Sequence, residues 1–429
     1  MKQIKQWELV AGCLFLGLGL GCIFYPSLNA DLFFYLVAGG LSISAGVFWF
    51  QAIRKPQGFM IASALICTIG AIILWMHRLE SEDLIINCFA FYMFFNMFCE
   101  GVQWFLDVRD RSNHVWAHAL MTVVYGFLCF FSWFYKDMDS RILMRLFGIY
   151  LLIQAFQMFN QIYAFSHPQS SRSYTFARWT ALPVYFVSVL PSLILRYMLL
   201  NKMKGKKADY SERKNDQEVN LRVFIHTGLK SEHIFGHMTF SYQGIMFSYG
   251  NYDKEEEKFF RSVGPGIFFT VPANIYINNS CIYEGSTLFE YGLHIDPQQE
   301  AKLEELVRDI FNHTYRWYSP IEQDPLGREH FHKYESDYAS RLSFRTGAKF
   351  RKFYSSQWKT YWILGDNCSL FASDLLSQID PGIVHKSGVV TPGEYFEFFE
   401  ECFADPKSNV VYKAWHSAEV PSTLYPTLA

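Results

Sequence analysis

One short stretch of the chain carries a residue capable of nucleophilic chemistry. In Gly365–Leu376 (GDNCSLFASDLL), Cys368 falls in the first turn of a predicted helix, with Asp366 or Asn367 as its N-cap. A thiol there faces unpaired backbone N–H groups and the positive end of the helix dipole, and both lower the pKa of a cysteine. We therefore treat Cys368 as a candidate nucleophile. The alternative is a small apolar residue that packs in an amphipathic helix.

A cysteine nucleophile needs a general base, which is usually a histidine brought close by the fold. His237 is our first choice, because it opens a predicted strand and follows Gly236, which lets a substrate or another backbone approach closely. Three other histidines compete with it. His226 lies within a strand, His233 lies in a predicted loop, and His294 ends a later strand.

The elements that must position these residues belong to the second of two contrasting halves. The 429 residues are 51% hydrophobic and carry a net charge of −2, which argues against nucleic acid as a partner. Residues up to about Leu200 are mostly apolar, whereas charges become frequent from Asn201 onward. We therefore expect a membrane domain over 1–200, a polar and basic linker over 201–220 and a further domain over 221–429.

The first half predicts about seven membrane-spanning helices, since a span needs roughly 20 apolar residues. Small residues repeat in Ala11–Gly21 and Ala38–Gly46, which lets helices pack closely. The predicted spans are Leu9–Ser27, Leu32–Ile53, Phe59–Met76, Leu84–Phe105, Trp116–Tyr135, Leu143–Phe165 and Ala177–Leu200.

We expect an integral protein of a bacterial cytoplasmic membrane. Basic residues in the loops favour a cytoplasmic N-terminus, but the lysines after the last span favour the cytoplasm for the second domain too. Seven spans cannot satisfy both, so the side of that domain stays open, as does the oligomeric state.

The second half alternates strand and helix signals of an α+β domain with a mainly antiparallel sheet. A hairpin is predicted over His237–Tyr249 around Gln243 and Gly244. Asp296 and Pro297 begin a helix expected to reach about Trp317, Cys368–Ile379 form another, and Thr391–Glu394 cap a last one over Tyr395–Phe403. The remaining predicted strands are Leu221–Thr227, Gly266–Ile277 and Thr287–Ile295, and Tyr318–Trp358 has no clear pattern.

No pattern calls for a metal or another cofactor. Six of the nine cysteines lie in the apolar half, and the chain has no CxxC pair. Glu329, His330 and His332 could ligate a metal, but no further ligand follows at a suitable spacing, so a surface loop is the simpler interpretation. We expect neither a metal nor a cofactor.

Two family resemblances follow from these motifs. The small-residue hairpins of the first two spans resemble the HdeD-type membrane proteins. The order GHMTFSYQGIMFSYG, then LGDNCSLFASDLL, then VVTPGEYFEFF resembles the circularly permuted papain-like fold of NlpC-type amidases and lecithin:retinol acyltransferase-type enzymes. In that branch the histidine strand precedes the cysteine helix, as it does here.

The papain-like resemblance implies roles for individual residues. Cys368 would be the nucleophile and His237 the general base. The family often places a third polar residue on the strand after the histidine, where this chain offers Ser248, Tyr249 and Asn251. We select Tyr249 and Asn251 as the candidates for orienting His237, and Asp253 would suit charge stabilisation if the strand reaches it.

The predicted function is a membrane-anchored cysteine enzyme. Cys368 would attack an ester or amide carbonyl and form an acyl-thioester, which water or another acceptor would then resolve. The membrane half favours acyl transfer or acyl hydrolysis on a membrane lipid, a lipoprotein or another envelope substrate. A cell-wall peptide amidase or endopeptidase, and a non-catalytic stress or scaffold protein, are the alternatives.

Overall fold

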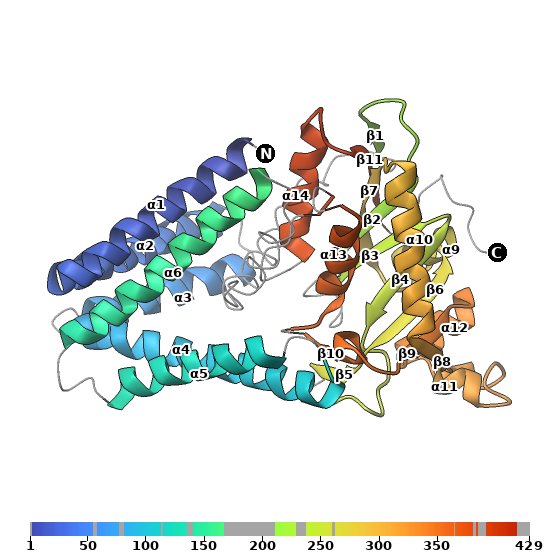
Figure 1. The fold of residues 1–429 in the computed structure, drawn as a ribbon, viewed down its shortest axis with the longest axis horizontal. Coiled ribbons are helices and arrows are strands. Elements are labelled where there is room, and N and C mark those ends of the chain that lie inside the picture. Colours follow the sequence, from blue (N-terminus) through green and yellow to red (C-terminus); the bar gives the residue numbers. More distant parts are fainter. Residues whose placement is uncertain are drawn as a thin grey trace. The chain divides into compact units, whose positions relative to one another are not determined.

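The computed structural model describes residues 2–54, 58–76, 81–112, 115–134, 140–166, 211–228, 237–259, 262–363, 365–380, 383–384 and 392–417 of the chain (Figure 1). They fall into two compact units. The helical unit consists of Gln3–Trp104 and Trp116–Ile162. The sheet unit consists of Met1–Lys2, Phe105–Val115 and Tyr163–Ala429.

Long apolar helices make up the described part of the helical unit. They are α1 (Lys2–Phe24), α2 (Pro26–Arg54), α3 (Gly58–Met76), α4 (Ser81–Asp110), α5 (Val115–Phe134) and α6 (Ser140–Ser166). Each matches one of the first six predicted spans. The seventh predicted span, Ala177–Leu200, and linker residues 201–210 lie outside the described residues.

The small residues allow backbone contact between helices, as the sequence predicts for the first span. A Cβ on Gly19 of α1 would lie 2.9 Å from the Gly148 carbonyl oxygen of α6, and a Cβ on Gly148 would lie 2.7 Å from the Gly19 carbonyl oxygen. The two helices can cross this closely only because both positions are glycine. Between α4 and α5, the imidazole of His118 lies 2.7 Å from the carboxylate of Glu100.

The length and hydropathy of the helices test the membrane prediction only in part. Among the described helices, Val115–Phe134 alone is both long and apolar enough to cross a membrane, with a mean hydropathy of 1.6. Shorter apolar stretches occur at Leu9–Phe24, Val37–Phe50, Ser63–Met76 and Met144–Phe156. Large apolar side chains are nevertheless exposed on all these helices, including Ile43, Ile66 and Val123, each with about 70% of its surface open.

A nine-stranded antiparallel sheet forms the centre of the sheet unit, which confirms the predicted α+β class. Its strand order is β1-β11-β7-β2-β3-β4-β6-β9-β8. The strands are β1 (Ser211–Arg213), β2 (Leu221–Gly228), β3 (His237–Tyr242), β4 (Ile245–Gly250), β6 (Ile267–Pro272), β7 (Ser286–Leu293), β8 (Thr314–Trp317), β9 (Lys349–Phe353) and β11 (Val410–His416). β5 (Val263–Pro265) and β10 (Thr360–Trp362) form a separate pair.

Helices cover both faces of this sheet. α10 (Pro297–Asn312), α13 (Cys368–Ile379) and α14 (Pro392–Ala404) pack on one face, here called the α13 face, around Phe240, Tyr249 and Phe371. α9 (Ala273–Asn278), the π-helical turn η2 (Asn279–Tyr283) and α12 (Tyr338–Thr346) pack on the other, the α12 face, around Phe269 and Phe350. The shorter elements are α11 (Pro320–Gln323), η3 (Phe331–Lys333) and η4 (Gln357–Lys359).

Several predicted elements are confirmed at their ends. The hairpin turns at Gln243 and Gly244, whose φ angles of 49° and 75° fit the type I′ turn that joins two tightly paired strands. Asp296 caps α10 with a full capping box and Pro297 in the first turn. α13 spans the predicted residues. The capping residue Thr391, predicted before α14, lies outside the described residues.

Other predictions were wrong, and in each case a nearby element explains the difference. The helix from Asp296 ends at Asn312 instead of Trp317, because Thr314–Trp317 pair with β9 as an edge strand. The strand predicted over Gly266–Ile277 stops at Pro272, where α9 begins. Ser211–Arg213, predicted as linker, pair with β11, a strand that the sequence reading missed.

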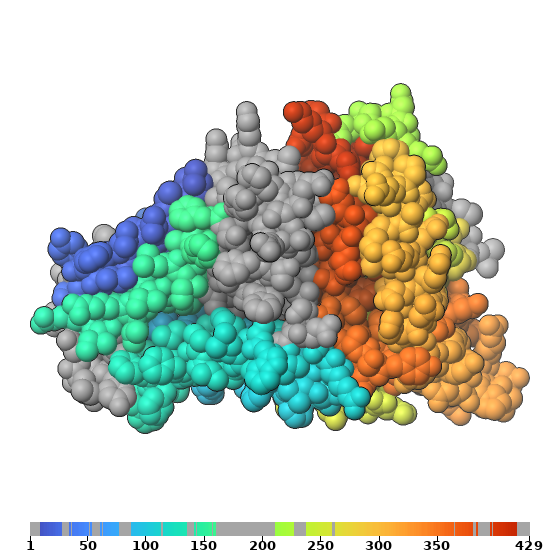
Figure 2. Space-filling view, viewed as in Figure 1, coloured from blue at the N-terminus to red at the C-terminus, as the bar shows by residue number. Residues whose placement is uncertain are grey.

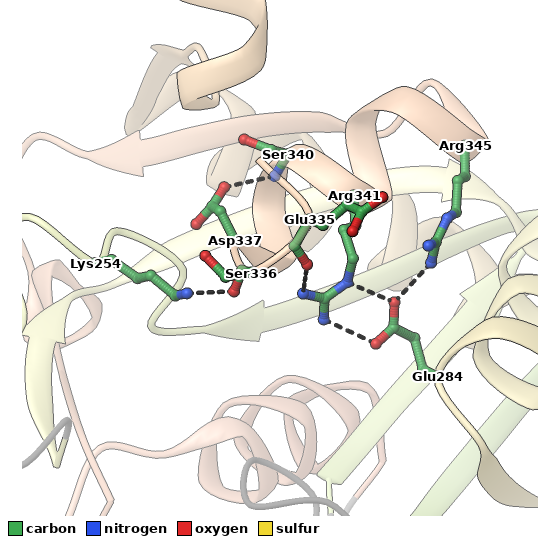
Figure 3. A network of polar contacts seen from close by, with 8 residues as sticks. All are labelled: Lys254, Glu284, Glu335, Ser336, Asp337, Ser340, Arg341 and Arg345. Carbon is green, nitrogen blue, oxygen red and sulfur yellow. Dashed lines mark hydrogen bonds and ion pairs between the residues drawn. The ribbon is translucent and has the colours of Figure 1, made fainter. Parts of the chain in front are cut away.

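An ion-pair network fastens α12 to the end of η2 (Figure 3). The Glu284 carboxylate accepts hydrogen bonds from Arg341 at 3.0 and 2.9 Å and from Arg345 at 3.1 Å. Arg341 also donates to the Glu335 carbonyl oxygen at 2.6 Å, and Asp337 caps α12 through the Ser340 N–H at 2.7 Å. The network therefore fixes the position of Tyr338 at the start of α12.

We expect Glu284→Gln to lower the free energy of unfolding of the sheet unit by about 2–3 kcal/mol, since it leaves two partly buried guanidinium groups without a carboxylate. Glu329→Gln is the matched control, because Glu329 is exposed. Chemical denaturation followed by tryptophan fluorescence measures both. Equal stability of the two variants would contradict the role given to Glu284.

Candidate active site

Cys368 is the first residue of α13, and its neighbour fixes the helix start. Asn367 is the N-cap: its side-chain oxygen accepts a hydrogen bond from the Leu370 N–H at 3.0 Å, and its amide donates to the Ile363 carbonyl oxygen at 3.2 Å. Of the two residues that the sequence offered as cap, Asn367 therefore takes the role. The Cys368 side chain is 5% exposed.

β3 and β4 stop pairing with each other near the start of α13. β3 and β4 pair from the turn at Gln243 and Gly244 only as far as Phe240 and Phe247. In this hairpin alternate residue pairs exchange backbone hydrogen bonds, so continued pairing would direct the Met238 N–H to Tyr249. That pair is not formed, and the Met238 N–H donates to Cys368 instead. The cysteine thus lies against the split end of β3 and β4.

The pKa of Cys368 is raised, whereas the sequence led us to expect a lowered pKa. Burial raises the pKa of the thiol, and the backbone N–H groups of Met238, Cys368 and Ser369 offset only part of this rise. The helix start stabilises the thiolate as predicted, but desolvation is the larger effect. At neutral pH the resting group is therefore a thiol.

His237 begins β3 and has a defined set of partners. Its Nε2 lies 2.7 Å from the Ser248 hydroxyl and 3.5 Å from the Tyr252 hydroxyl, and these two hydroxyls are 3.2 Å apart. Among the described residues, Nδ1 has no hydrogen-bond partner. Burial lowers the pKa of His237 to about 4, so the imidazole is neutral at physiological pH.

A second histidine, His226, contacts the ring of His237 on the α12 face. His226 and His237 occupy paired positions of β2 and β3, and their rings meet edge to face with centroids 5.3 Å apart. His226 Nε2 lies 3.0 Å from the Thr239 hydroxyl, and its ring lies 5.6 Å from that of Tyr276. His226 is fully buried, so it supports the position of His237 and does not face a substrate.

Cys368 and His237 approach the sheet from different sides. The side chains of Met238 and Phe240 point to the α13 face, so those of His237 and Thr239 point to the α12 face. α13 packs on the first of these faces. The split end of β3 and β4 is where the two side chains can meet, and the hydrogen bond from Met238 places Cys368 there.

Tyr249 and Asn251, the residues predicted to orient His237, contact other groups. The Tyr249 hydroxyl donates to the Trp358 carbonyl oxygen at 3.0 Å, and its ring stacks on Phe371 with centroids 4.7 Å apart. Asn251 packs against Gly264, where an added Cβ would overlap its side chain. Ser248 and Tyr252 hold the imidazole instead, and catalytic roles for Tyr249 and Asn251 stay predictions.

The reason for this difference is the two-residue period of a strand. Ser248 lies on the same face of the sheet as His237, whereas Tyr249 points to the opposite face. Ser248 was among the polar residues predicted on this strand, and its place on the same face as His237 could have identified it. Tyr252 follows β4 outside any strand, and no sequence signal places its hydroxyl.

The other candidate residues lie elsewhere. His294 is at the opposite end of the sheet from His237. It follows Leu293, which pairs with Leu221 of β2, and Leu221 in turn pairs with Tyr242 at the turn end of β3. Asp253 forms an ion pair with Lys352 at 2.7 Å. His233 is outside the described residues, and no group of potential metal ligands occurs within the described part of the chain.

Comparisons with known proteins found no family model, no curated protein and no solved structure that matches the chain. The geometry of the residues around Cys368 and His237 therefore carries the functional argument by itself.

The lowered pKa of His237 predicts how stability depends on pH. An unfolded histidine titrates near 6.5, so between pH 6.5 and about 4 the unfolded chain binds a proton that the folded chain excludes, and stability falls as the pH falls. Between pH 7 and 5 the wild type should lose at most about 2 kcal/mol more than His237→Gln, at 1.4 kcal/mol per pKa unit. Denaturation of the full chain in detergent at both pH values measures this. The same pH dependence in both proteins would refute a desolvated imidazole.

Proposed function

We propose that the protein is a cysteine acyltransferase or acyl hydrolase, with Cys368 as nucleophile and His237 as general base. The observation that supports this best is the contact of Cys368 with the Met238 N–H, one residue from an imidazole whose Nε2 is already held by Ser248. The arrangement is in keeping with the permuted papain-like resemblance, in which a cysteine helix meets the start of a histidine strand.

The reaction starts from two neutral groups. If Nε2 carries the ring proton and donates it to Ser248, the lone pair of Nδ1 is available as a base. As the sulfur attacks an ester or amide carbonyl, the thiol proton passes to Nδ1, and His237 then returns it to the leaving alcohol or amine. The product is an acyl-thioester on Cys368, and water or a second alcohol or amine resolves it.

The start of α13 supplies the electrostatic support that this step needs. The carbonyl oxygen becomes an oxyanion in the tetrahedral intermediate, and backbone N–H groups at a helix N-terminus stabilise such charge. The N–H groups of Cys368 and Ser369 both lie beside the sulfur, and both lower the pKa of the thiol. They are the proposed oxyanion donors.

The helical unit favours a lipid-linked substrate, and we propose that it lies in a membrane. Exposed apolar side chains such as Ile43, Ile66, Leu120 and Val123 are unusual in water but ordinary in lipid. An enzyme anchored in this way meets membrane lipids, lipoproteins and other envelope molecules at high local concentration. We therefore prefer an acyl group carried by one of these over a soluble peptide.

Cys368→Ala should lower acyl release from a lipid ester by more than about 1000-fold, because nothing replaces the nucleophile. The assay uses washed membranes from cells that express the full chain, after carbonate extraction, which also tests whether the protein stays in the membrane. Cys402→Ala is the matched control, since Cys402 is equally buried but lies in α14.

Three outcomes would contradict this proposal or part of it. Undiminished acyl release by Cys368→Ala would leave a scaffold role for the domain. Cleavage of a cell-wall peptide without acyl release, lost in the same variant, would favour the amidase alternative. Loss of the protein from extracted membranes would remove the argument for a lipid-linked substrate.

Substitutions at Ser248 and Tyr249 distinguish a residue that orients the His237 ring from one that packs beside the site. Ser248→Ala should lower kcat roughly 10- to 100-fold with little change in KM, because Nε2 loses the partner that fixes the ring. Ser248→Thr keeps the hydroxyl and should restore most of the activity. Tyr249→Phe should lower stability through the lost bond to Trp358 but leave kcat near that of the wild type. A larger loss of kcat in Tyr249→Phe than in Ser248→Ala would reverse the assignment.

A further inference from the structure

The end of α4 belongs to the sheet unit. The helix starts in the helical unit, but its last residues lie within Phe105–Val115, which the sheet unit includes. The Ser112 N–H donates to the Asp107 carbonyl oxygen at 3.0 Å, and Arg111 between them has a φ of 59°. A hydrogen bond of this span around a left-handed residue is the Schellman motif, which gives the end of α4 a defined conformation.

The last residue of α4 makes a buried polar contact with β10. Asp110 is 3% exposed, and its Oδ2 accepts a hydrogen bond from the Thr360 hydroxyl at 2.5 Å. The Arg109 guanidinium donates to both oxygens of this carboxylate, at 2.9 and 3.1 Å, and also to the Thr360 hydroxyl oxygen. The Lys359 ammonium lies 3.9 Å from the carboxylate. The buried charge of Asp110 is therefore balanced by two cations and directed at one hydroxyl.

β10 needs such an anchor because it is short and lies outside the nine-stranded sheet. Among the described strands, Thr360–Trp362 pair with Val263–Pro265 alone. A two-stranded pair is only marginally stable by itself in water. The contact with Asp110 holds the first residue of β10, and the Gly266 N–H holds the residue before it by donating to the Lys359 carbonyl oxygen at 2.8 Å.

The other end of β10 sets the start of α13. The Trp362 N–H donates to the Asp366 carbonyl oxygen at 3.2 Å. The side-chain amide of Asn367, the N-cap of α13, donates to the Ile363 carbonyl oxygen, also at 3.2 Å. These two hydrogen bonds tie the cap of the helix to the end of a three-residue strand. A shift of β10 therefore moves the cap, and with it Cys368.

The remaining contacts of α13 hold the helix from the side. α13 lies next to α10 in the sheet unit, as Figure 2 shows. Phe371 of α13 stacks on Tyr249, with ring centroids 4.7 Å apart. Apolar packing of this kind has no preferred direction, so it fixes the position of a helix along its own axis less well than hydrogen bonds do. The position of Cys368 along that axis depends on the residues before the helix.

We propose that Asp110 and Thr360 are positioning residues for the nucleophile. Their contact fixes the start of β10, β10 fixes the cap at Asn367, and the cap places Cys368 beside the Met238 N–H. Neither residue touches the substrate. The effect on turnover rests on the function proposed above, whereas the anchoring of β10 does not. A displacement of about 1 Å at a reacting group can cost about 100-fold in rate.

Removal of one hydroxyl tests the anchor. Thr360→Val keeps a strand-forming side chain of similar shape but cannot donate to Asp110. In the full-length protein in detergent, we expect backbone amides within residues 362–370 to exchange with deuterium at least roughly 10-fold faster than in the wild type. We also expect kcat for acyl release to fall roughly 10- to 100-fold with little change in KM. Thr360→Ser keeps the hydroxyl and should restore both values.

Thr314→Val is the matched control. It also removes a buried strand hydroxyl in contact with an arginine, 2.8 Å from Nε of Arg351, but it does so in β8. Exchange within residues 362–370 and kcat should both stay near the wild-type values. Asp110→Ala removes the other half of the contact and keeps the test decisive if Thr360→Val folds poorly. Its cationic partners Arg109 and Lys359 are exposed, so their charges remain solvated.

The outcomes separate the anchor from the proposed chemistry. Unchanged exchange within residues 362–370 in both Thr360→Val and Asp110→Ala, or an equal change in Thr314→Val, would overturn the anchor. Faster exchange with unchanged kcat would overturn the positioning role. Faster exchange in a protein whose wild type releases no acyl group would support the anchor and refute the proposed function.

Discussion

The incomplete pairing of β3 with β4 is the constraint on which the candidate site depends. If the ladder continued past Phe240 and Phe247, the Met238 N–H would be used within the sheet. Because it ends there, the N–H donates to Cys368 and the start of α13 lies against the sheet end. The N-cap at Asn367 then sets which residue of the helix reaches that position.

Each face of the sheet contributes a different part of the site. The α13 face holds the cysteine helix, with Phe371 of that helix stacked on Tyr249 of β4. The α12 face holds His237 with Ser248 and Tyr252, and Tyr252 stacks on Tyr338, with centroids 5.6 Å apart. The Glu284 network (Figure 3) holds α12, and with it Tyr338. The ion pairs of α12 are thereby connected through Tyr338 and Tyr252 to the imidazole of His237.

Local signals in the sequence predicted much of this fold. Caps, turn residues and strand alternation placed α13, the start of α10 and the hairpin around Gly244, because each is set by a few neighbouring residues. The short edge strands β1 and β8 were misread, since such strands become stable only through partners distant in sequence, and β11, which pairs with β1, was missed. The raised pKa of Cys368 also escaped prediction, because desolvation depends on the whole packed domain.

The central claim is that Cys368 carries an acyl group during turnover. Intact-mass analysis of the full-length protein, quenched in acid during reaction with a lipid ester and followed by peptide mapping, tests it directly. We expect a mass increase equal to one acyl group, located on the peptide that contains Cys368 and absent from Cys368→Ala. An acyl group on another residue, a peptide-bearing adduct, or no adduct while substrate is consumed would contradict it.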